Sequence, residues 1–169
     1  KFNELEFFYP YYRFLEAGLN VDVASPKGGD ITGADGHSFK NTRKVSEVQA
    51  VDYVLLYLPG GKAPASLRKE EDVLNIARQF AMTDKPIAAI CHGPQILAAA
   101  KLIDGKRISA WPEVEAEIKE AGGSYMNAAL MEDGQFITAR WPGDLPGHVA
   151  AALKHIRESG ALGARRSAA

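Results

Sequence analysis

The sequence predicts an α/β fold built on a mainly parallel sheet with helices on both faces. Two short apolar runs, at 51–58 and 87–90, have the length and composition of strands buried on both faces. Segments with helical periodicity alternate with such runs, which is typical of parallel strands joined by helical crossovers. The 169 residues contain no internal repeat and no linker. We therefore expect one domain over 1–159, followed by a flexible tail over 160–169.

The elements of the first half follow from apolar periodicity and from glycine and proline. In order, we expect a helix over 4–17, a short strand over 21–25, a glycine-rich connection over 26–36, the buried strand over 51–58 and a helix over 70–80. In the last of these, Val73, Ile76, Ala77 and Phe80 recur at the spacing of one helix face.

The second half continues the alternation of strand and helix. In order, we expect the buried strand over 87–90, a helix over 95–100, a helix over 112–121 closed by Gly122-Gly123, a hairpin over 128–139 and a last helix over 145–156. The hairpin is indicated by Asp133-Gly134, a dipeptide that suits a tight turn between strands.

The helix over 4–17 carries apolar residues on nearly all sides. Its apolar residues are Leu5, Phe7, Phe8, Tyr11, Tyr12, Phe14 and Leu15. One stripe is expected to face the sheet and the other to need cover, which favours a homo-oligomer of at least two subunits. Pro10 lies inside this helix and should kink it near Glu6.

Composition narrows the class of protein. The 20 basic and 21 acidic residues give a net charge of −1, so nothing favours nucleic acid or a membrane surface as a partner. A single cysteine excludes an internal disulfide framework and fits a reducing, cytoplasmic compartment. No histidine shows metal-ligand spacing and no glycine motif fits a nucleotide, so we predict no metal and no cofactor.

The only cysteine lies where an apolar run stops and a helical pattern begins. Cys91 follows the strand over 87–90 and precedes His92-Gly93-Pro94. Gly93 permits close backbone approach, and Pro94 suits a first helical turn. A sharp strand-to-helix turn places a side chain in a cleft at the carboxyl end of the sheet, facing helix N–H groups. We therefore predict a nucleophilic Cys91 with a strained backbone and a lowered pKa.

Several motifs in order resemble the ThiJ/PfpI family, in particular its intracellular protease I or general stress protein branch. The matching segments are Tyr9-Pro10-Tyr11, Ala24 to Gly29, Ile31-Thr32-Gly33, Leu58 to Pro64, Ala89 to Gln95 and Arg140 to Leu145. The resemblance covers nearly the whole chain. It implies a three-layer α/β/α sandwich of flavodoxin-like topology with a nucleophile elbow. It also implies a central first strand that would precede Lys1 and is missing from this sequence.

The resemblance implies roles for individual residues. Cys91 would be the nucleophile, and Gly60 and Gly61, with Gly93, would let backbone N–H groups reach an oxyanion. His92 matches a histidine that pairs with a glutamate of a neighbouring subunit in a hexameric ring. That glutamate matches Glu71, which read by itself is a solvated acid in the first turn of a helix.

Three further residues border the implied site. The family usually places a glutamate beside the cysteine, and Asn3 stands at the aligned position, where it cannot act as an acid or base near neutral pH. The adjacent Glu4 is a possible substitute. Trp111 and Trp141 match loops that wall the site, and ordinary loop packing explains them equally well.

Three functions remain open at this point. The first is a cysteine hydrolase acting on peptides through Cys91, His92 and Glu71. The second is a glyoxalase-type or deglycase-type enzyme acting on small reactive carbonyls such as methylglyoxal, whose mechanism depends on the acid that Asn3 replaces. The third is a non-catalytic, stress-related protein whose Cys91 is reversibly oxidised. The absence of that acid favours the first or the third.

Overall fold

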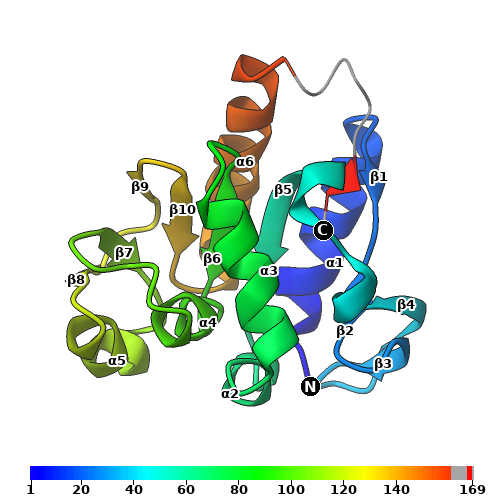
Figure 1. Ribbon diagram of the computed structural model, residues 1–169, viewed down its shortest axis with the longest axis horizontal. Helices are drawn as coiled ribbons and strands as arrows, with labels where there is room; N and C mark the ends of the chain where they lie inside the picture. Colours follow the sequence, from blue (N-terminus) through cyan, green and yellow to red (C-terminus); the bar gives the residue numbers. More distant parts are fainter. Residues whose placement is uncertain (161–166, 169) are drawn as a thin grey trace.

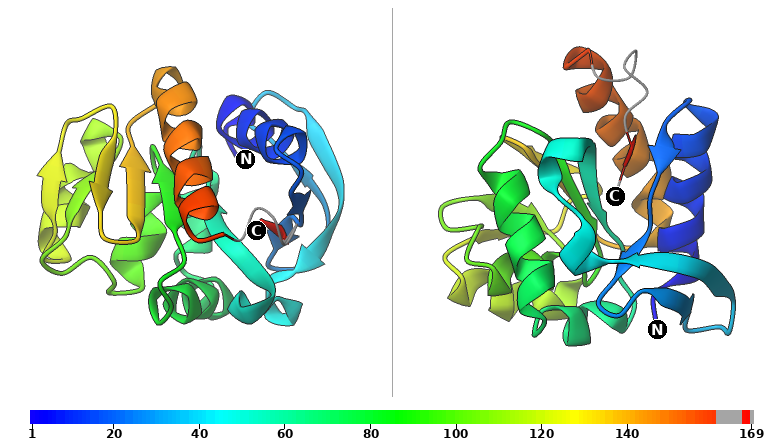
Figure 2. Two further views of the ribbon diagram at one scale, coloured as in Figure 1. Left: turned by 90° about the horizontal axis from the view of Figure 1, so that it is seen from above. Right: turned by 45° about the vertical axis from the view of Figure 1, so that its right-hand side comes forward.

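A six-stranded sheet forms the middle layer of the computed structural model, which describes residues 1–160 and 167–168. The strands lie in the order β1-β11-β5-β6-β10-β9, and all pair in parallel except β9, which is antiparallel to β10. Their bounds are β1 Asn20–Val21, β11 Ser167–Ala168, β5 Tyr53–Leu58, β6 Ile87–Ile90, β10 Phe136–Ala139 and β9 Met131–Asp133. Helices cover both faces, so the predicted three-layer α/β/α fold is confirmed (Figures 1 and 2).

The helices divide between the two faces of the sheet. One face is covered by α2 (Ala63–Leu67), α3 (Glu71–Ala81), α4 (Pro94–Ala99) and α5 (Glu115–Glu120), and the other by α1 (Glu4–Glu16) and α6 (Leu145–Glu158). Side chains of the central strands enter the core on both faces of the sheet. In β5, Leu56 and Leu58 join the core under α3, whereas Leu55 and Tyr57 join the core under α1 and α6. This is the pattern of a strand buried on both faces, as its continuous apolar run predicts.

Two small sheets lie outside the central one. The strands β2 (Ala24–Ser25), β4 (Ser38–Lys44) and β3 (Gly29–Thr32) form one, and β7 (Arg107–Ser109) and β8 (Ser124–Met126) form the other. The predicted strand over 21–25 is therefore wrong as a unit, because its ends belong to different sheets. The connection over 26–36 contains β3, which the glycine-rich composition concealed. Most side chains of β4 are exposed, so no apolar run marks it.

The remaining elements differ from expectation mainly at their ends. A 3₁₀ turn occupies 50–52, so the strand expected from 51 begins at Tyr53, and 112–114 is a 3₁₀ turn before α5. The hairpin turns at Gly134 as predicted. Most of the expected tail lies outside the described residues. Its residues Ser167–Ala168 form β11 between β1 and β5, which the prediction of a tail missed.

Packing differs on the two sides of β5. Its partner β6 is 0% exposed throughout and continues into β10 with regular parallel register. On the other side, a cavity of about 470 Å³ lies between β5, α1 and α3, with walls that include Phe14, Leu56 and Ile76. Cys91 follows β6, so the candidate site is carried by the tightly packed half of the sheet.

Candidate active site

Cys91 lies at a sharp turn between β6 and α4. Its φ is +61°, a left-handed conformation that is uncommon outside glycine and costs free energy unless neighbouring structure enforces it. Here the turn is held on both sides. The Cys91 N–H donates to the Ala139 carbonyl at 3.1 Å, and the Gly93 N–H donates to the Ile90 carbonyl at 2.8 Å. The predicted strained elbow is confirmed.

Glycine is required where neighbouring backbone touches this turn. A Cβ on Gly93 would overlap the Leu58 carbonyl, which belongs to the adjacent strand. A Cβ on Gly60 would overlap the Glu6 carboxyl and come within 2.7 Å of the Cys91 Cβ. The Pro59-Gly60-Gly61 turn after β5 therefore lies directly against the elbow, as the position of both at strand carboxyl ends predicted.

A buried carboxyl group faces the Cys91 thiol, and it belongs to Glu6. This side chain is 0% exposed, and its Oε1 accepts a hydrogen bond from the Gly60 N–H at 3.0 Å. Burial raises the pKa of Glu6 to about 7, although contact with Cys91 and the Gly60 hydrogen bond oppose the shift. Its Oε2 is buried with no hydrogen-bond partner among the described residues. Near neutral pH this group is therefore divided between acid and base forms.

The assignment of Asn3 to the position beside the cysteine is therefore wrong. Asn3 caps α1: its Oδ1 accepts from the Glu6 N–H at 3.1 Å and its carbonyl accepts from the Phe7 N–H. Glu4 does not replace the acid either, because its Oε1 accepts from the Asp35 N–H at 2.7 Å in another loop. A helix begins at Glu4, so the acid comes from its first turn instead of the preceding loop.

A sequence signal for Glu6 exists. Glu6, Pro10 and Phe14 are spaced by four residues and share the buried face of α1. An acid on the apolar stripe of a helix is rarely placed there without a partner or a function. Pro10 adds a local effect, since it has no N–H to donate to the Glu6 carbonyl one turn earlier.

The thiol environment differs from the predicted one. Burial and the charge of Glu6 raise the pKa of Cys91 to about 12, while the N–H groups of Gly61 and His92 act to lower it. The predicted lowered pKa is wrong because burial and the Glu6 charge outweigh these two N–H groups, and α4 adds no free N–H of its own. Pro94 has no N–H, the Gly93 N–H bonds to Ile90, and the Gln95 N–H bonds to His92. Cys91 therefore needs a base to become a nucleophile at neutral pH.

The glycine turn supplies one donor to the thiol, not two. The Gly60 N–H is already engaged by Glu6, whereas the N–H groups of Gly61 and His92 act on the sulfur. Gly61 therefore approaches the Cys91 thiol closely, as predicted, whereas Gly60 holds the Glu6 carboxyl group. Charge that develops next to Cys91 would meet the Gly61 and His92 N–H groups first.

His92 lies against Cys91 although the two are adjacent in the chain. Its Nδ1 is 3.3 Å from the Cys91 Sγ, a contact that the sequence did not lead us to expect. The left-handed backbone of Cys91 breaks the usual alternation of side chains and brings the two together. Burial lowers the pKa of His92, and the charges of Glu113 and Glu117 oppose that shift. The imidazole is therefore mostly neutral near pH 7.

Glu71 lies at the start of α3 and pairs with Arg78 of the same helix, with Oε1 and Nη1 2.7 Å apart. The acids that act on His92 within the described chain are Glu113 and Glu117. Glu117 is itself fixed, because its Oε1 accepts from Gln95 Nε2 at 2.9 Å. A pairing of Glu71 with His92 from a neighbouring subunit stays a prediction.

Trp111 lies against His92, and Trp141 lies against Trp111. The His92 and Trp111 rings stack with centroids 6.2 Å apart, and Trp111 meets Trp141 edge to face at 6.1 Å. The Trp111 backbone N–H donates to the Cys91 carbonyl at 2.9 Å, which ties this loop to the elbow. The Arg140 guanidinium lies 3.9 Å from the centre of the Trp141 ring.

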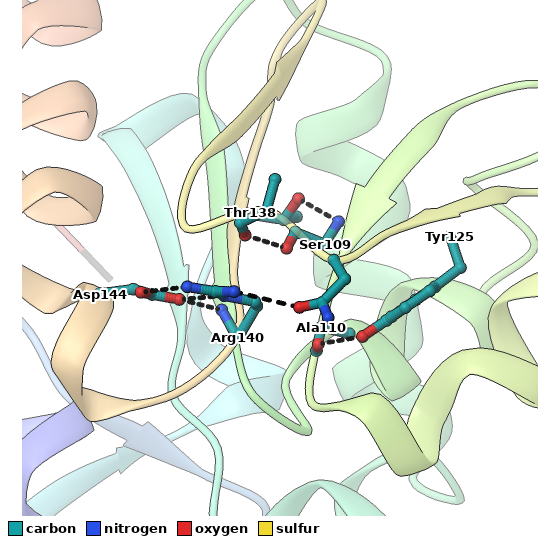
Figure 3. Close-up of polar contacts among 8 residues, drawn as sticks. Ser109, Ala110, Tyr125, Thr138, Arg140 and Asp144 are labelled. Carbon is teal, nitrogen blue, oxygen red and sulfur yellow. Dashed lines mark hydrogen bonds and ion pairs between the residues drawn. The ribbon is translucent and has the colours of Figure 1, made fainter.

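Figure 3 shows the polar contacts of Arg140 with Asp144 and of Tyr125 with Ala110. Arg140 donates from Nε and Nη2 to the two oxygens of Asp144, at 2.9 and 3.1 Å. Asp144 is 8% exposed, and its pKa is lowered because the hydrogen bonds from Arg140 outweigh the effect of burial. Tyr125 donates from its hydroxyl to the Ala110 carbonyl at 3.1 Å, which fixes the segment before Trp111.

His148 is a buried titratable group with a structural role. His148 is bonded between the Tyr57 hydroxyl at 3.1 Å and the Ile137 carbonyl at 2.8 Å, and burial lowers its pKa to about 4. Over residues 1–160, no three His, Cys, Asp or Glu side chains gather closely enough to hold a metal ion. In the same part of the chain, no helix is long and apolar enough to cross a membrane.

The strained strand-to-helix turn that carries Cys91, with a buried acid and an adjacent imidazole, places this chain among α/β proteins with a candidate site at the carboxyl edge of a parallel sheet. Residues 1–155 match the model of the DJ-1/PfpI family, and the chain belongs to that family.

Named relatives and a solved structure agree with this membership. Deglycase PfpI of Pyrococcus furiosus is 37% identical over 145 residues, which cover 86% of this chain and 87% of that protein. A putative cysteine protease, YraA of Bacillus subtilis, is 33% identical over 146 residues and 86% of each chain. The crystal structure of a ThiJ/PfpI domain protein from Brachyspira murdochii superposes with a TM-score of 0.89 at 23% identity, covering 94% of this chain and 91% of that one.

Proposed function

We propose that this protein is a deglycase-type or glyoxalase-type enzyme, in which Cys91 adds to the carbonyl of small 1,2-dicarbonyl compounds or of their early adducts with amines and thiols. The observation that carries the proposal is the buried Glu6 beside the thiol, with a pKa raised to about 7. An acid divided between its two forms at neutral pH can take up and return a proton within one reaction cycle. The deglycase names of relatives support the same chemistry.

In the first step, the Glu6 carboxylate accepts the thiol proton as Sγ attacks the aldehyde carbon. The C–S bond forms, the C=O π electrons move to oxygen, and the oxygen takes the proton back from Glu6 to give a hemithioacetal. The N–H groups of Gly61 and His92, which act on the sulfur, would be the nearest donors to the developing oxyanion. A thiol whose pKa is about 12 makes such a local base necessary.

For a dicarbonyl, the second step moves hydrogen within the substrate. Glu6 removes the proton from the hemithioacetal carbon, and the neighbouring carbon receives a proton. The aldehyde carbon is thereby oxidised to a thioester while the ketone is reduced to an alcohol, so no external oxidant is needed. Water then cleaves the thioester, releasing a hydroxy acid and the Cys91 thiol. For an adduct with an amine, Sγ forms a bond to the carbinol carbon as its C–N bond breaks, and the departing amine takes the thiol proton from Glu6, which leaves the same hemithioacetal.

The second candidate is a peptidase, and the observation that favours it is the contact between His92 Nδ1 and Cys91 Sγ at 3.3 Å. A neutral imidazole can serve a thiol nucleophile in acyl transfer. A relative with the name of a putative cysteine protease supports this reading. It requires that His92 protonate a leaving amine, a task for which Glu71 of a neighbouring subunit would orient the ring.

A parallel assay of one pure sample tests the proposal. Turnover of methylglyoxal and of a glycated thiol is measured beside hydrolysis of fluorogenic peptides, with Cys91→Ser and Glu6→Gln as matched variants. We expect dicarbonyl turnover that is lost in both variants. Peptide hydrolysis that survives Glu6→Gln but not Cys91→Ser would establish the peptidase instead. Absence of saturable turnover on all three substrates would overturn both and leave a redox-responsive Cys91.

A further inference from the structure

Trp111 and Trp141 form a corner, and Trp111 joins this corner to the Cys91 thiol through His92. Trp111 stacks on His92, whose imidazole touches the Cys91 sulfur, and Trp141 meets Trp111 at an interplanar angle of 79°. Both side chains are partly exposed. Two rings at nearly a right angle offer a planar ligand a face to stack on and an edge to contact at once.

The corner is rigid because each of its walls is held from behind. His92 stacks against Trp111, and the Trp111 backbone N–H donates to the Cys91 carbonyl, which fixes the main chain that carries the ring. Arg140 covers a face of Trp141 at 3.9 Å and is itself fixed by two hydrogen bonds to Asp144. Asn127 accepts a further hydrogen bond from Arg140 Nη1 at 3.1 Å. An arginine held by a fork of this kind keeps one orientation, so the ring beneath it does too.

The Arg140–Asp144 pair is poorly placed to bind an anion itself. Its charge is balanced by a carboxylate whose side chain is only 6% exposed, and three guanidinium N–H groups are already used. Arg140 instead packs against the Trp141 ring while Asp144 holds it. The Arg140 side chain is 18% exposed, and its position behind the ring is the feature that a positioning role requires.

We propose that Trp111 and Trp141 select substrates that carry a planar aromatic group next to the reacting carbon, and that Arg140 and Asp144 are positioning residues for Trp141. This inference deepens the proposed function by naming the substrate class, aromatic in preference to small aliphatic carbonyl compounds. It concerns recognition at Cys91 and therefore has a test that does not depend on turnover.

The test compares alkylation of Cys91 by N-phenylmaleimide and by N-methylmaleimide. The ratio of the two rate constants is divided by the same ratio for glutathione, which removes the intrinsic reactivity of each reagent. We expect a normalised preference for the phenyl reagent of roughly two- to tenfold, the range that aromatic pairing supplies. Trp141→Leu keeps an apolar side chain of moderate size and is expected to abolish the preference.

Asp144→Asn tests the positioning role, since it releases Arg140 while leaving both tryptophans in place. We expect the preference to fall towards unity and the near-ultraviolet circular dichroism of the coupled tryptophans to weaken. The matched control is Asp22→Asn, which removes an ion pair with Arg43 at 2.9 Å near the start of β5, where Tyr53 also bonds to Asp22. It should leave both readings unchanged, whatever it does to thermal stability.

The outcomes separate cleanly. A normalised ratio of one in the wild type, or a preference that survives Trp141→Leu, overturns the proposal whether or not the protein turns over dicarbonyls. Loss of the preference in Asp144→Asn and Asp22→Asn alike would overturn the positioning role. A phenyl preference without any dicarbonyl turnover would support the recognition corner and refute the proposed function alone. If Asp144→Asn does not fold, Arg140→Lys replaces it, because a lysine cannot form the planar fork.

Discussion

The two sides of Cys91 are built differently. On one side lies Glu6, which is 0% exposed and enclosed by α1 and the Gly60 turn. On the other side lie His92 and Trp111, which are both partly exposed and come from the loops that follow β6 and β7. The closed side holds an acid whose pKa is raised by burial, and the open side holds an imidazole whose pKa burial lowers.

This difference assigns separate tasks to the two sides. Burial favours the neutral form of both groups. Near pH 7, Glu6 is therefore divided between its acid and base forms, and His92 is mostly neutral. The closed group can hold a proton out of contact with water during a reaction, whereas the open group borders the surface that a substrate must cross. Chemistry is therefore expected to depend most on Glu6, and recognition to depend most on the His92–Trp111 side.

Replacing the closed acid should have the largest effect. Glu6→Gln keeps the size of the side chain and a hydrogen bond from Gly60 but cannot carry a proton. We expect dicarbonyl turnover to fall by about 10²–10⁴-fold, the usual contribution of a positioned acid or base. Steady-state kinetics of the wild type and of Asn3→Ala, the cap residue, provide the comparison. Turnover within threefold of the wild type in Glu6→Gln would show that the closed side is not catalytic.

The same acid should make stability depend on pH. The pKa of Glu6 is raised from 4.5 to about 7 in the fold, so the folded state binds more protons than the unfolded state between these values. The stabilising contribution is therefore complete below pH 4.5 and is lost as pH rises through 7, by about 3 kcal/mol in all. Urea unfolding of the wild type and Glu6→Gln across this range measures the difference. Parallel curves for the two proteins would contradict the raised pKa.

The pH dependence of Cys91 alkylation should show a smaller difference between the two sides. Because burial and the Glu6 charge raise the Cys91 pKa, alkylation by iodoacetamide should have a midpoint above the free-thiol value of about 8.5. Glu6→Gln removes the charge and should shift that midpoint to lower pH. His92→Ala, on the open side, should not reproduce the shift. A wild-type midpoint below 8.5 would restore the lowered pKa that the elbow alone suggested.

The sequence predicted the core of this fold more completely than the site. Strands such as β5 and β6 are continuous apolar runs, and Cys91 between strand and helix gave the elbow directly. The polar strand β4 carries no comparable pattern, because exposed pairing needs no apolar alternation. The strands β7 and β8 have three residues each, which is too short for a pattern to stand out.

The closed side of the site was hidden for a related reason. Glu6 lies 85 residues from Cys91 in the sequence, so its place on the apolar stripe of α1 indicates that it is buried but not which residue it faces. Asn3, Glu4 and Glu6 all stand near the start of one helix, and helix phase alone separates a cap, a loop anchor and an active-site acid. The contact between Cys91 and His92 depends likewise on a backbone angle that spacing does not reveal.

The smallest expected effect concerns the acids that act on the His92 pKa. It would show whether the open side depends on the formation of an oligomer. Leu5, Tyr12 and Leu15 of α1 are 62%, 61% and 41% exposed, which favours a homo-oligomer, and light scattering measures its size.

The His92 pKa, followed by NMR, should fall in Glu113→Gln at any protein concentration, because that charge acts within one chain. If Glu71 of a neighbouring subunit also acts on His92, Glu71→Gln should lower the pKa only where the oligomer is populated. Glu120→Gln, an exposed acid on α5, is the control and should change nothing. A stable monomer, or a Glu71→Gln effect that persists on dilution to monomers, would remove the cross-subunit role and leave the open side complete within one chain.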